Sequence, residues 1–157
     1  MARALRGERA ALQRCIGHLA IEIQHVGSTA VPGLDAKPII DIAVAVRAVE
    51  AIPYIRPLLV ELGYIDRGDN GRDGGYLLVK ECGAEVRTHH LHIVTVDGPQ
   101  WHNYLLFRDR LAAGETLRSR YAQLKQELQA RFREGRALYT RAKHGFIRAV
   151  LDGGQTR

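Results

Sequence analysis

The chain has 157 residues, of which 46% are hydrophobic and 25% are charged, and its formal net charge is +6. This composition predicts one globular domain over residues 1–157 with a frayed tail at 152–157. No apolar run is long enough for a membrane-spanning helix or a signal peptide, so we expect a cytoplasmic protein with no membrane partner. The basic excess alternates with acidic residues in the C-terminal third, which is typical of solvated helices and not of a nucleic-acid surface, but the same charges suit a small anionic ligand.

The first half of the chain predicts a helix and then two strands joined by a tight loop. Apolar residues recur at helical spacing over residues 2–18, and apolar and polar residues alternate over residues 21–26, as in a half-buried strand. A turn begins at Gly27 and is closed by Pro32-Gly33. Residues 38–46 predict a second strand, in which Asp41 is a charge within an apolar run. Its alternation puts Ile40, Ile42, Val44 and Val46 on one face and Ile39, Asp41, Ala43 and Ala45 on the other.

The second half predicts one more helix, further strands and three final helices. A helical stripe covers residues 49–62, where Pro57 predicts a kink or a later helix start. A short strand begins at residues 63–65, and glycine-rich residues 66–75 predict a flexible loop or a long hairpin turn. Residues 76–80 and 85–96 predict antiparallel strands, and residues 101–111, 117–132 and 137–151 predict helices. This order indicates an α+β fold: a mixed β-sheet with flanking helices and a C-terminal helical cap.

The loop between the first two strands predicts a ligand site. Gly27 lets the backbone approach a ligand, and the hydroxyls of Ser28 and Thr29 with nearby amides can face phosphate oxygens. Asp41 is a candidate ligand for magnesium, which prefers carboxylate oxygen and shares it with phosphates. The Gly27-Ser28 loop followed by Asp41 on a strand resembles the arrangement that binds a nucleoside triphosphate and magnesium in the nucleotidyltransferase superfamily. Ala43 stands where that superfamily has its second carboxylate. A purely structural role for Asp41, bonding the loop amides, is the alternative.

The motifs along the chain resemble those of the GrpB family. They are His25-Val26-Gly27-Ser28-Thr29, Val31-Pro32-Gly33-Leu34, Lys37-Pro38-Ile39-Ile40-Asp41-Ile42, His90-Leu91-His92, Trp101, Phe107-Arg108-Asp109, Tyr121 with Lys125, and Tyr139 with Lys143. The resemblance spans residues 21–151 and implies a nucleotidyltransferase-like fold. GrpB-like domains also occur fused behind dephospho-CoA kinase, which implies a helper of folding or stability as another role.

Two histidines form the second part of the predicted site. His90 and His92 are two residues apart on a strand, so they share a face and can bind a metal or act as acid and base, whereas His89 faces the other way. The resemblance places this pair beside Asp41. We therefore predict Asp41, His90 and His92 as catalytic residues and as ligands of Mg²⁺ or another divalent metal; a histidine held by a core hydrogen bond is the alternative.

Further cations are predicted to bind the substrate. Lys37 precedes the Asp41 strand and can neutralise an anion. The resemblance adds Arg108, Tyr121 and Lys125 on the cap helices, where the last two lie at i and i+4 on one face. A structural pair of Arg108 with Asp109 and a core role for Tyr121 are the alternatives.

Together these features predict a protein that binds a nucleotide or another anionic small molecule between the Gly27-Ser28 loop, Asp41 and the His90/His92 strand. Nucleotidyl transfer is the reaction that the resemblance implies. A metal- or histidine-dependent enzyme that acts on a small substrate without nucleotide is the second hypothesis, and a non-catalytic binding or chaperone-like module is the third. The oligomeric state stays open.

Overall fold

A five-stranded mixed sheet forms the centre of the fold in the computed structural model, which describes residues 1–69, 75–133 and 135–153. Its strands are β1 (Glu22–Val26), β2 (Ile40–Val46), β3 (Ile65–Asp69), β4 (Tyr76–Glu81) and β5 (Arg87–Thr95). They lie in the order β1-β2-β5-β4-β3, with β2 and β5 parallel and all other neighbours antiparallel.

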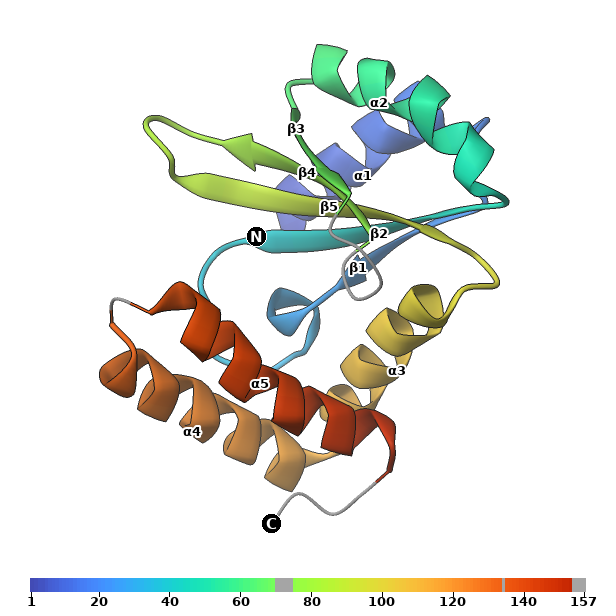
Figure 1. The fold of residues 1–157 in the computed structure, drawn as a ribbon. Helices are drawn as coiled ribbons and strands as arrows, with labels where there is room; N and C mark the ends of the chain where they lie inside the picture. Colours follow the sequence, from blue (N-terminus) through green and yellow to red (C-terminus); the bar gives the residue numbers. More distant parts are fainter. Residues whose placement is uncertain (70–74, 134, 154–157) are drawn as a thin grey trace.

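Helices cover both faces of this sheet (Figure 1). Helices α1 (Ala2–Ile16) and α2 (Ile52–Glu61) lie on one face, and α3 (Pro99–Ala113), α4 (Glu115–Arg131) and α5 (Arg136–Leu151) lie on the other. Two short 3₁₀ helices, η1 (Ser28–Ala30) and η2 (Val49–Ala51), follow β1 and β2. This confirms the predicted α+β fold with flanking helices and a C-terminal cap. No helix in the described ranges has the length and apolarity needed to cross a membrane.

The alternating side chains of β2 separate two cores. Ile42 and Val44 are buried with the apolar residues of α1 and α2, while Ala43 and Ala45 are buried on the opposite face with Trp101 of α3. This is the alternation predicted from the sequence, since successive residues of a strand point to opposite faces. Asp41 shares the face of Ala43, so the fold turns its carboxylate toward the cap helices.

A third core holds the cap helices together and attaches them to the loop after β1. Its buried members are Val31 of the loop, Leu111 of α3 and Tyr121 of α4. The Tyr121 ring lies between Phe107, at 5.4 Å, and Phe146 of α5, at 5.2 Å. One apolar cluster therefore fixes the loop, α3, α4 and α5 relative to one another.

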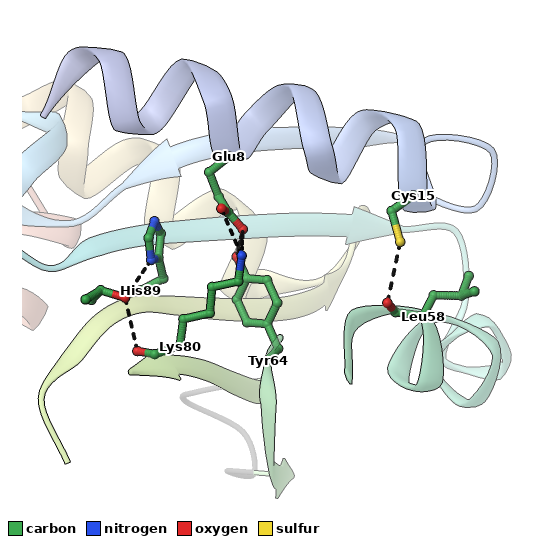
Figure 2. Close-up of polar contacts among 7 residues, drawn as sticks. Glu8, Cys15, Leu58, Tyr64, Lys80 and His89 are labelled. Carbon is green, nitrogen blue, oxygen red and sulfur yellow. Dashed lines mark hydrogen bonds and ion pairs between the residues drawn. The ribbon is translucent and has the colours of Figure 1, made fainter. Parts of the chain in front are cut away.

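A polar cluster anchors α1 to the face of the sheet opposite the cap (Figure 2). The ammonium of Lys80 donates hydrogen bonds to Glu8 at 2.8 and 3.0 Å, and the Tyr64 hydroxyl donates to the same carboxylate at 2.6 Å. Burial by itself would raise the pKa of Glu8, but these hydrogen bonds outweigh it and lower that pKa. Glu8 is thus held ionised, which stabilises the contact of α1 with β4.

One local prediction is wrong. Residues 66–69 belong to β3 and not to a loop. Asp66 accepts hydrogen bonds from Arg56 at 2.7 Å and from Tyr76 at 2.7 Å, which hold it beside β4; residues 70–74 lie outside the described residues.

Of the two alternatives for Pro57, the structure excludes the later helix start, because helix α2 begins at Ile52 and continues through that proline. Its residues Ile55 and Leu59 are fully buried, and their burial offsets the hydrogen bond that a proline cannot donate.

Candidate functional site

The loop after β1 lies directly against the Asp41 carboxylate. Gly27 has φ 73° and ψ −171°, a conformation that is essentially restricted to glycine. A Cβ atom at this position would lie 2.6 Å from Asp41 Oδ2, closer than any stable contact. The glycine is therefore required both by its backbone conformation and by the side chain opposite.

Thr29 closes the loop through two hydrogen bonds. Its hydroxyl donates to the carbonyl of Ile39 at 3.0 Å and lies 2.9 Å from His25 Nε2. Because the hydroxyl proton is used on the carbonyl, His25 must donate its Nε2–H to the Thr29 oxygen. Burial is the main cause that lowers the pKa of His25, which agrees with a neutral imidazole in this place. Thr29 lines a cavity beside Asp41, but its hydroxyl already has two protein partners, and its role in binding a substrate stays a prediction.

Asp41 lies between the two predicted histidines. In the parallel pair of β2 and β5, Asp41 is opposite His90 and Ala43 is opposite His92. Asp41 Oδ1 lies 3.2 Å from His90 Nδ1 and 3.9 Å from His92 Nε2. Burial alone would raise the pKa of Asp41, but the two imidazoles outweigh it and lower that pKa to about 2. Asp41 is therefore an ionised carboxylate that interacts with both imidazole rings.

This pairing fixes the orientation of His90. An ionised carboxylate only accepts hydrogen bonds, so His90 donates Nδ1–H to Asp41, and in the neutral ring Nε2 is left as an acceptor. That Nε2 atom is buried, and no hydrogen-bond partner for it occurs among the described residues. An imidazole with one nitrogen held by a carboxylate and the other unpaired is arranged to accept a proton.

The alternation of β5 puts His89 on the other face, as predicted. Its Nδ1 lies 2.9 Å from the Thr88 hydroxyl, near Glu8 and Lys80 (Figure 2). His89 is thus part of the surroundings of α1 and not of the site with Asp41.

Two lysines from the cap helices converge above the loop. Lys125 of α4 donates to the Ser28 hydroxyl at 3.2 Å and to the Asp35 carbonyl at 3.2 Å. Its ammonium lies 5.1 Å from the centre of the Tyr121 ring, and that of Lys143, on α5, lies 5.8 Å from the same ring. Burial first, and then the charge of Lys143, lower the pKa of Lys125. The cap thereby brings two cations to one side of the Gly27-Ser28 loop.

Tyr121 is both a core residue and a wall of the site. Its side chain is 2% exposed, and burial raises the pKa of its hydroxyl to about 12, against the opposing effect of a hydrogen bond with Ser28. The phenol is therefore protonated over the physiological pH range. The structure therefore confirms that Tyr121 is a core residue, and its role in binding a substrate stays a prediction.

Two cavities open between the sheet and the cap. The first, which we call the cationic cavity, has a volume of about 1040 Å³ and is lined by Ser28, Lys37, Asp41, His90, Lys125 and Lys143 among others. The second, the aromatic cavity, has a volume of about 920 Å³ and is lined by Val26, His92, Tyr104, Phe107, Tyr121 and Ile147 among others. Ser28, Asp41 and Lys143 line both.

The structure brings together most of the predicted site residues but not all. Arg108 is not among the residues that line either cavity. Its guanidinium donates to Gln24 at 3.1 Å, to the His25 carbonyl at 3.0 Å and to Asp109 at 2.8 Å, so it holds α3 on β1. Lys143, which was named from the sequence only within the family motif with Tyr139, also lines both cavities.

The donor atoms at the site do not suit magnesium. The described part of the chain contains no group of three or more His, Cys, Asp or Glu side chains placed to hold a metal ion. Mg²⁺ takes a set of oxygen ligands, whereas imidazole nitrogens suit transition metals. Here Asp41 faces two imidazoles, and Ala43 supplies no oxygen from its side chain. A bound divalent metal therefore stays a prediction.

The fold and this arrangement of loop, carboxylate, imidazoles and lysines define an α+β domain with a site under a helical cap. A family model described as GrpB protein matches residues 2–153. The chain thus belongs to the GrpB family, which confirms the resemblance.

Solved and curated relatives agree with this assignment. A crystal structure of conserved protein GrpB from Enterococcus faecalis superposes with a TM-score of 0.84 at 31% identity and covers 97% of this chain and 90% of that one. The chain is 33% identical to the glutamate-rich protein GrpB of Alkalihalophilus pseudofirmus over 148 residues, which are 92% of this chain and 85% of the relative. It is 36% identical to the UPF0157 protein YqkA of Bacillus subtilis over 148 residues, 94% of this chain but only 43% of that relative.

Proposed function

We propose that this protein binds a phosphate-bearing or otherwise anionic small molecule in the cationic cavity, with a nucleotide as the leading candidate. The observation that carries the proposal is the convergence of Lys125 and Lys143 over the Tyr121 ring, beside the Ser28 hydroxyl.

Bringing two ammonium groups together in a partly buried place is costly. Burial disfavours the charged form of Lys125, and the positive charge of Lys143 disfavours it further, which is the direction of its lowered pKa. The bonds that Lys125 makes to Ser28 and Asp35 go to a hydroxyl and a backbone carbonyl, so they do not cancel its charge. The Asp35 and Asp41 carboxylates favour the charged form of Lys125, but they do not outweigh burial and the charge of Lys143, and Asp41 is itself paired with two imidazoles. An anion between the lysines would relieve the repulsion, and the field of the two cations would attract it.

The loop beneath the lysines suits the same kind of ligand. The positive φ of Gly27 turns the chain sharply after β1, which lets the Ser28 hydroxyl line both cavities. Lys37, which is exposed, lines the cationic cavity from the other end of the loop. Hydroxyl and ammonium donors around one cavity favour phosphate oxygens as acceptors.

Catalysis by a histidine is the second candidate, and the Asp41–His90 pair favours it. Asp41 holds the Nδ1–H of His90 at 3.2 Å, and the Nε2 of that ring has no partner among the described residues. Because this Nε2 is buried, it would accept the proton of a hydroxyl that attacks a phosphorus or carbonyl centre only when ligand binding opens a way to it. In nucleotidyl transfer this would be the proton of the acceptor hydroxyl. In an enzyme that uses no nucleotide it would be the proton of water or of the substrate itself.

Thermal unfolding with added ligand tests the binding proposal. Wild type is compared with Lys125→Gln, Lys143→Gln and the control Arg47→Gln, which removes a charge at an exposed position outside both cavities. The ligands are tripolyphosphate and the four common nucleoside triphosphates, each with and without magnesium. A ligand at about 100 times its Kd contributes about 2.7 kcal/mol, which raises the Tm of a domain of this size by about 5–10 °C.

We expect this rise in wild type and Arg47→Gln and its loss in both lysine variants. Equal shifts in all four proteins, or none in any, would show that the cavity does not bind such anions. The same screen on Asp41→Asn and on His90→Ala with His92→Ala separates the other hypotheses. Stabilisation by a transition metal alone that requires the histidines favours the nucleotide-independent enzyme, and no stabilisation by any ligand favours the non-catalytic module.

A further inference from the structure

The two cavities meet along a strip made of three side chains. Ser28 from the loop and Asp41 from β2 lie on the sheet side of the strip, and Lys143 of α5 lies on the cap side. The two histidines that face Asp41 are divided between the cavities, because His90 lines the cationic one and His92 lines the aromatic one. The two cavities therefore adjoin at Asp41, and the site of the lysines lies next to the aromatic cavity.

The charges that line the two cavities differ. Among the described residues, the cationic cavity has four cations and two carboxylates, namely Lys37, Lys125, Arg133 and Lys143 against Asp35 and Asp41. The aromatic cavity has two of each, namely Lys143 and Arg148 against Asp41 and Asp152. Only the first has an excess of positive charge, so an anionic group has reason to prefer it.

The walls of the aromatic cavity suit a flat apolar group. Tyr104 and Phe107 of α3 and Ile147 of α5 line it. The Tyr104 ring lies 5.1 Å from the His92 ring with an angle of 34° between their planes, so two rings already contact each other in a tilted arrangement at this cavity. Aromatic side chains bind other rings by stacking, and a ligand ring would extend this arrangement.

The aromatic cavity is large for a small-molecule site. Its volume of about 920 Å³ is at the upper end of the range of about 300–1,000 Å³ for small-molecule sites. A phosphate or a polyphosphate alone would occupy the cationic cavity and leave this space to water. Two adjoining cavities that differ in charge and in lining suit a molecule with two chemically different ends.

We propose that the two cavities form one two-part site, which binds a phosphate ester whose phosphate lies at Lys125 and Lys143 and whose aromatic ring lies between Tyr104 and Ile147. This inference rests on the proposed function, since the phosphate end is the anion proposed above. It adds that the ring contributes to affinity through contacts with α3 and α5.

Calorimetric titration with matched ligands tests the two ends separately. One pair is inorganic phosphate and 1-naphthyl phosphate, and the other is tripolyphosphate and each of the four common nucleoside triphosphates. The key variant is Asn103→Trp, because Asn103 is an exposed residue of α3 that lines the aromatic cavity and a tryptophan there would fill it. Asn103→Ala is the matched control, which changes the same position without filling the space.

We expect at least one ring-bearing ligand to bind about tenfold or more tightly than its ring-free partner in wild type and in Asn103→Ala. Asn103→Trp should remove this gain and leave the affinity for the ring-free partner unchanged, while Lys125→Gln should weaken both members of the pair. If the ring adds nothing in wild type, or if the gain survives in Asn103→Trp, the two-part site is wrong even though the anion site stands. If neither member of any pair binds wild type, the proposed function itself fails.

Discussion

Replacing Gly27 with alanine tests the contact between the loop and Asp41 on which the site depends. The new methyl group would occupy a backbone conformation of φ 73° and ψ −171° and would lie 2.6 Å from Asp41 Oδ2. The loop and the carboxylate cannot both keep their positions. We therefore expect Gly27→Ala to lower the free energy of unfolding and to disturb the Asp41–His90 pair.

The expected loss has two parts. The backbone conformation costs a non-glycine residue about 1–3 kcal/mol. Moving the carboxylate weakens its hydrogen bond with His90, and a bond to a charged group contributes about 1.5–3 kcal/mol. The sum, about 2.5–6 kcal/mol, is a large part of the about 5–15 kcal/mol by which a domain is normally stable.

Urea unfolding of four variants separates these parts. Gly83→Ala is the matched control, because Gly83 also has a positive φ of 68° but a Cβ there would meet nothing within 4 Å. It should lose only the backbone part, about 1–2 kcal/mol. Asp41→Ala and the double variant Gly27→Ala/Asp41→Ala complete a cycle, in which removing the carboxylate should reduce the cost of the alanine to its backbone part.

Two results would contradict this reasoning. One is a loss in Gly27→Ala no larger than that in Gly83→Ala. The other is an equal cost of Gly27→Ala with and without the Asp41 side chain, which would mean that the loop and the carboxylate are not in contact in solution.

Three further predictions concern charges at and away from the site. The pKa of Asp41 is lowered from 3.8 to about 2 in the folded protein, so its ionised form stabilises the fold by about 2 kcal/mol at neutral pH. This stabilisation is lost as the pH falls from about 5 to 2, and the difference in free energy of urea unfolding between wild type and Asp41→Asn should shrink over that range. A difference that stays constant would contradict the pairing. Lys80→Met should lower the free energy of unfolding by about 2–4 kcal/mol, since it leaves the Glu8 carboxylate half-buried without its cation. Adding Glu8→Gln should recover part of this loss in the same assay, and no recovery would argue against the ion pair. Lys125→Gln should change the Tm of the ligand-free protein by less than about 2 °C, because losing its hydrogen bonds is offset by relief of burial and repulsion; a large fall in calorimetric Tm would give Lys125 a structural role instead.

The sequence was sufficient for features that depend on local spacing. The alternation of β2 placed Asp41 on the face opposite Ile42, and the alternation of β5 separated His89 from His90 and His92. Both follow from the twofold period of a strand. The resemblance to the GrpB family correctly joined these strands into one fold.

Features that depend on partners distant in the chain could not be read in the same way. The strand at residues 66–69 is fixed by Arg56 and Tyr76, whose contact with Asp66 exists only after α2 and β4 have packed. The position of Lys143 at both cavities could not be read, because helical periodicity does not say which face of α5 turns to the sheet. The contact of Arg108 with β1 could not be read either, because nothing in its surroundings along the chain indicates that it reaches back to Gln24 and His25.

The alternation of β5 also determines where this chain tolerates a change in length. One residue inserted between His90 and His92 would place these two histidines on opposite faces of the sheet, because successive residues of a strand alternate in direction. The exposed turn at 82–86 is different, because an irregularity in pairing between Lys80 and Glu81 already separates it from the register of the strand. Length can therefore vary in that hairpin, whereas a single residue added between the two histidines would leave only one of them facing Asp41 and disrupt the site without replacing any of its residues.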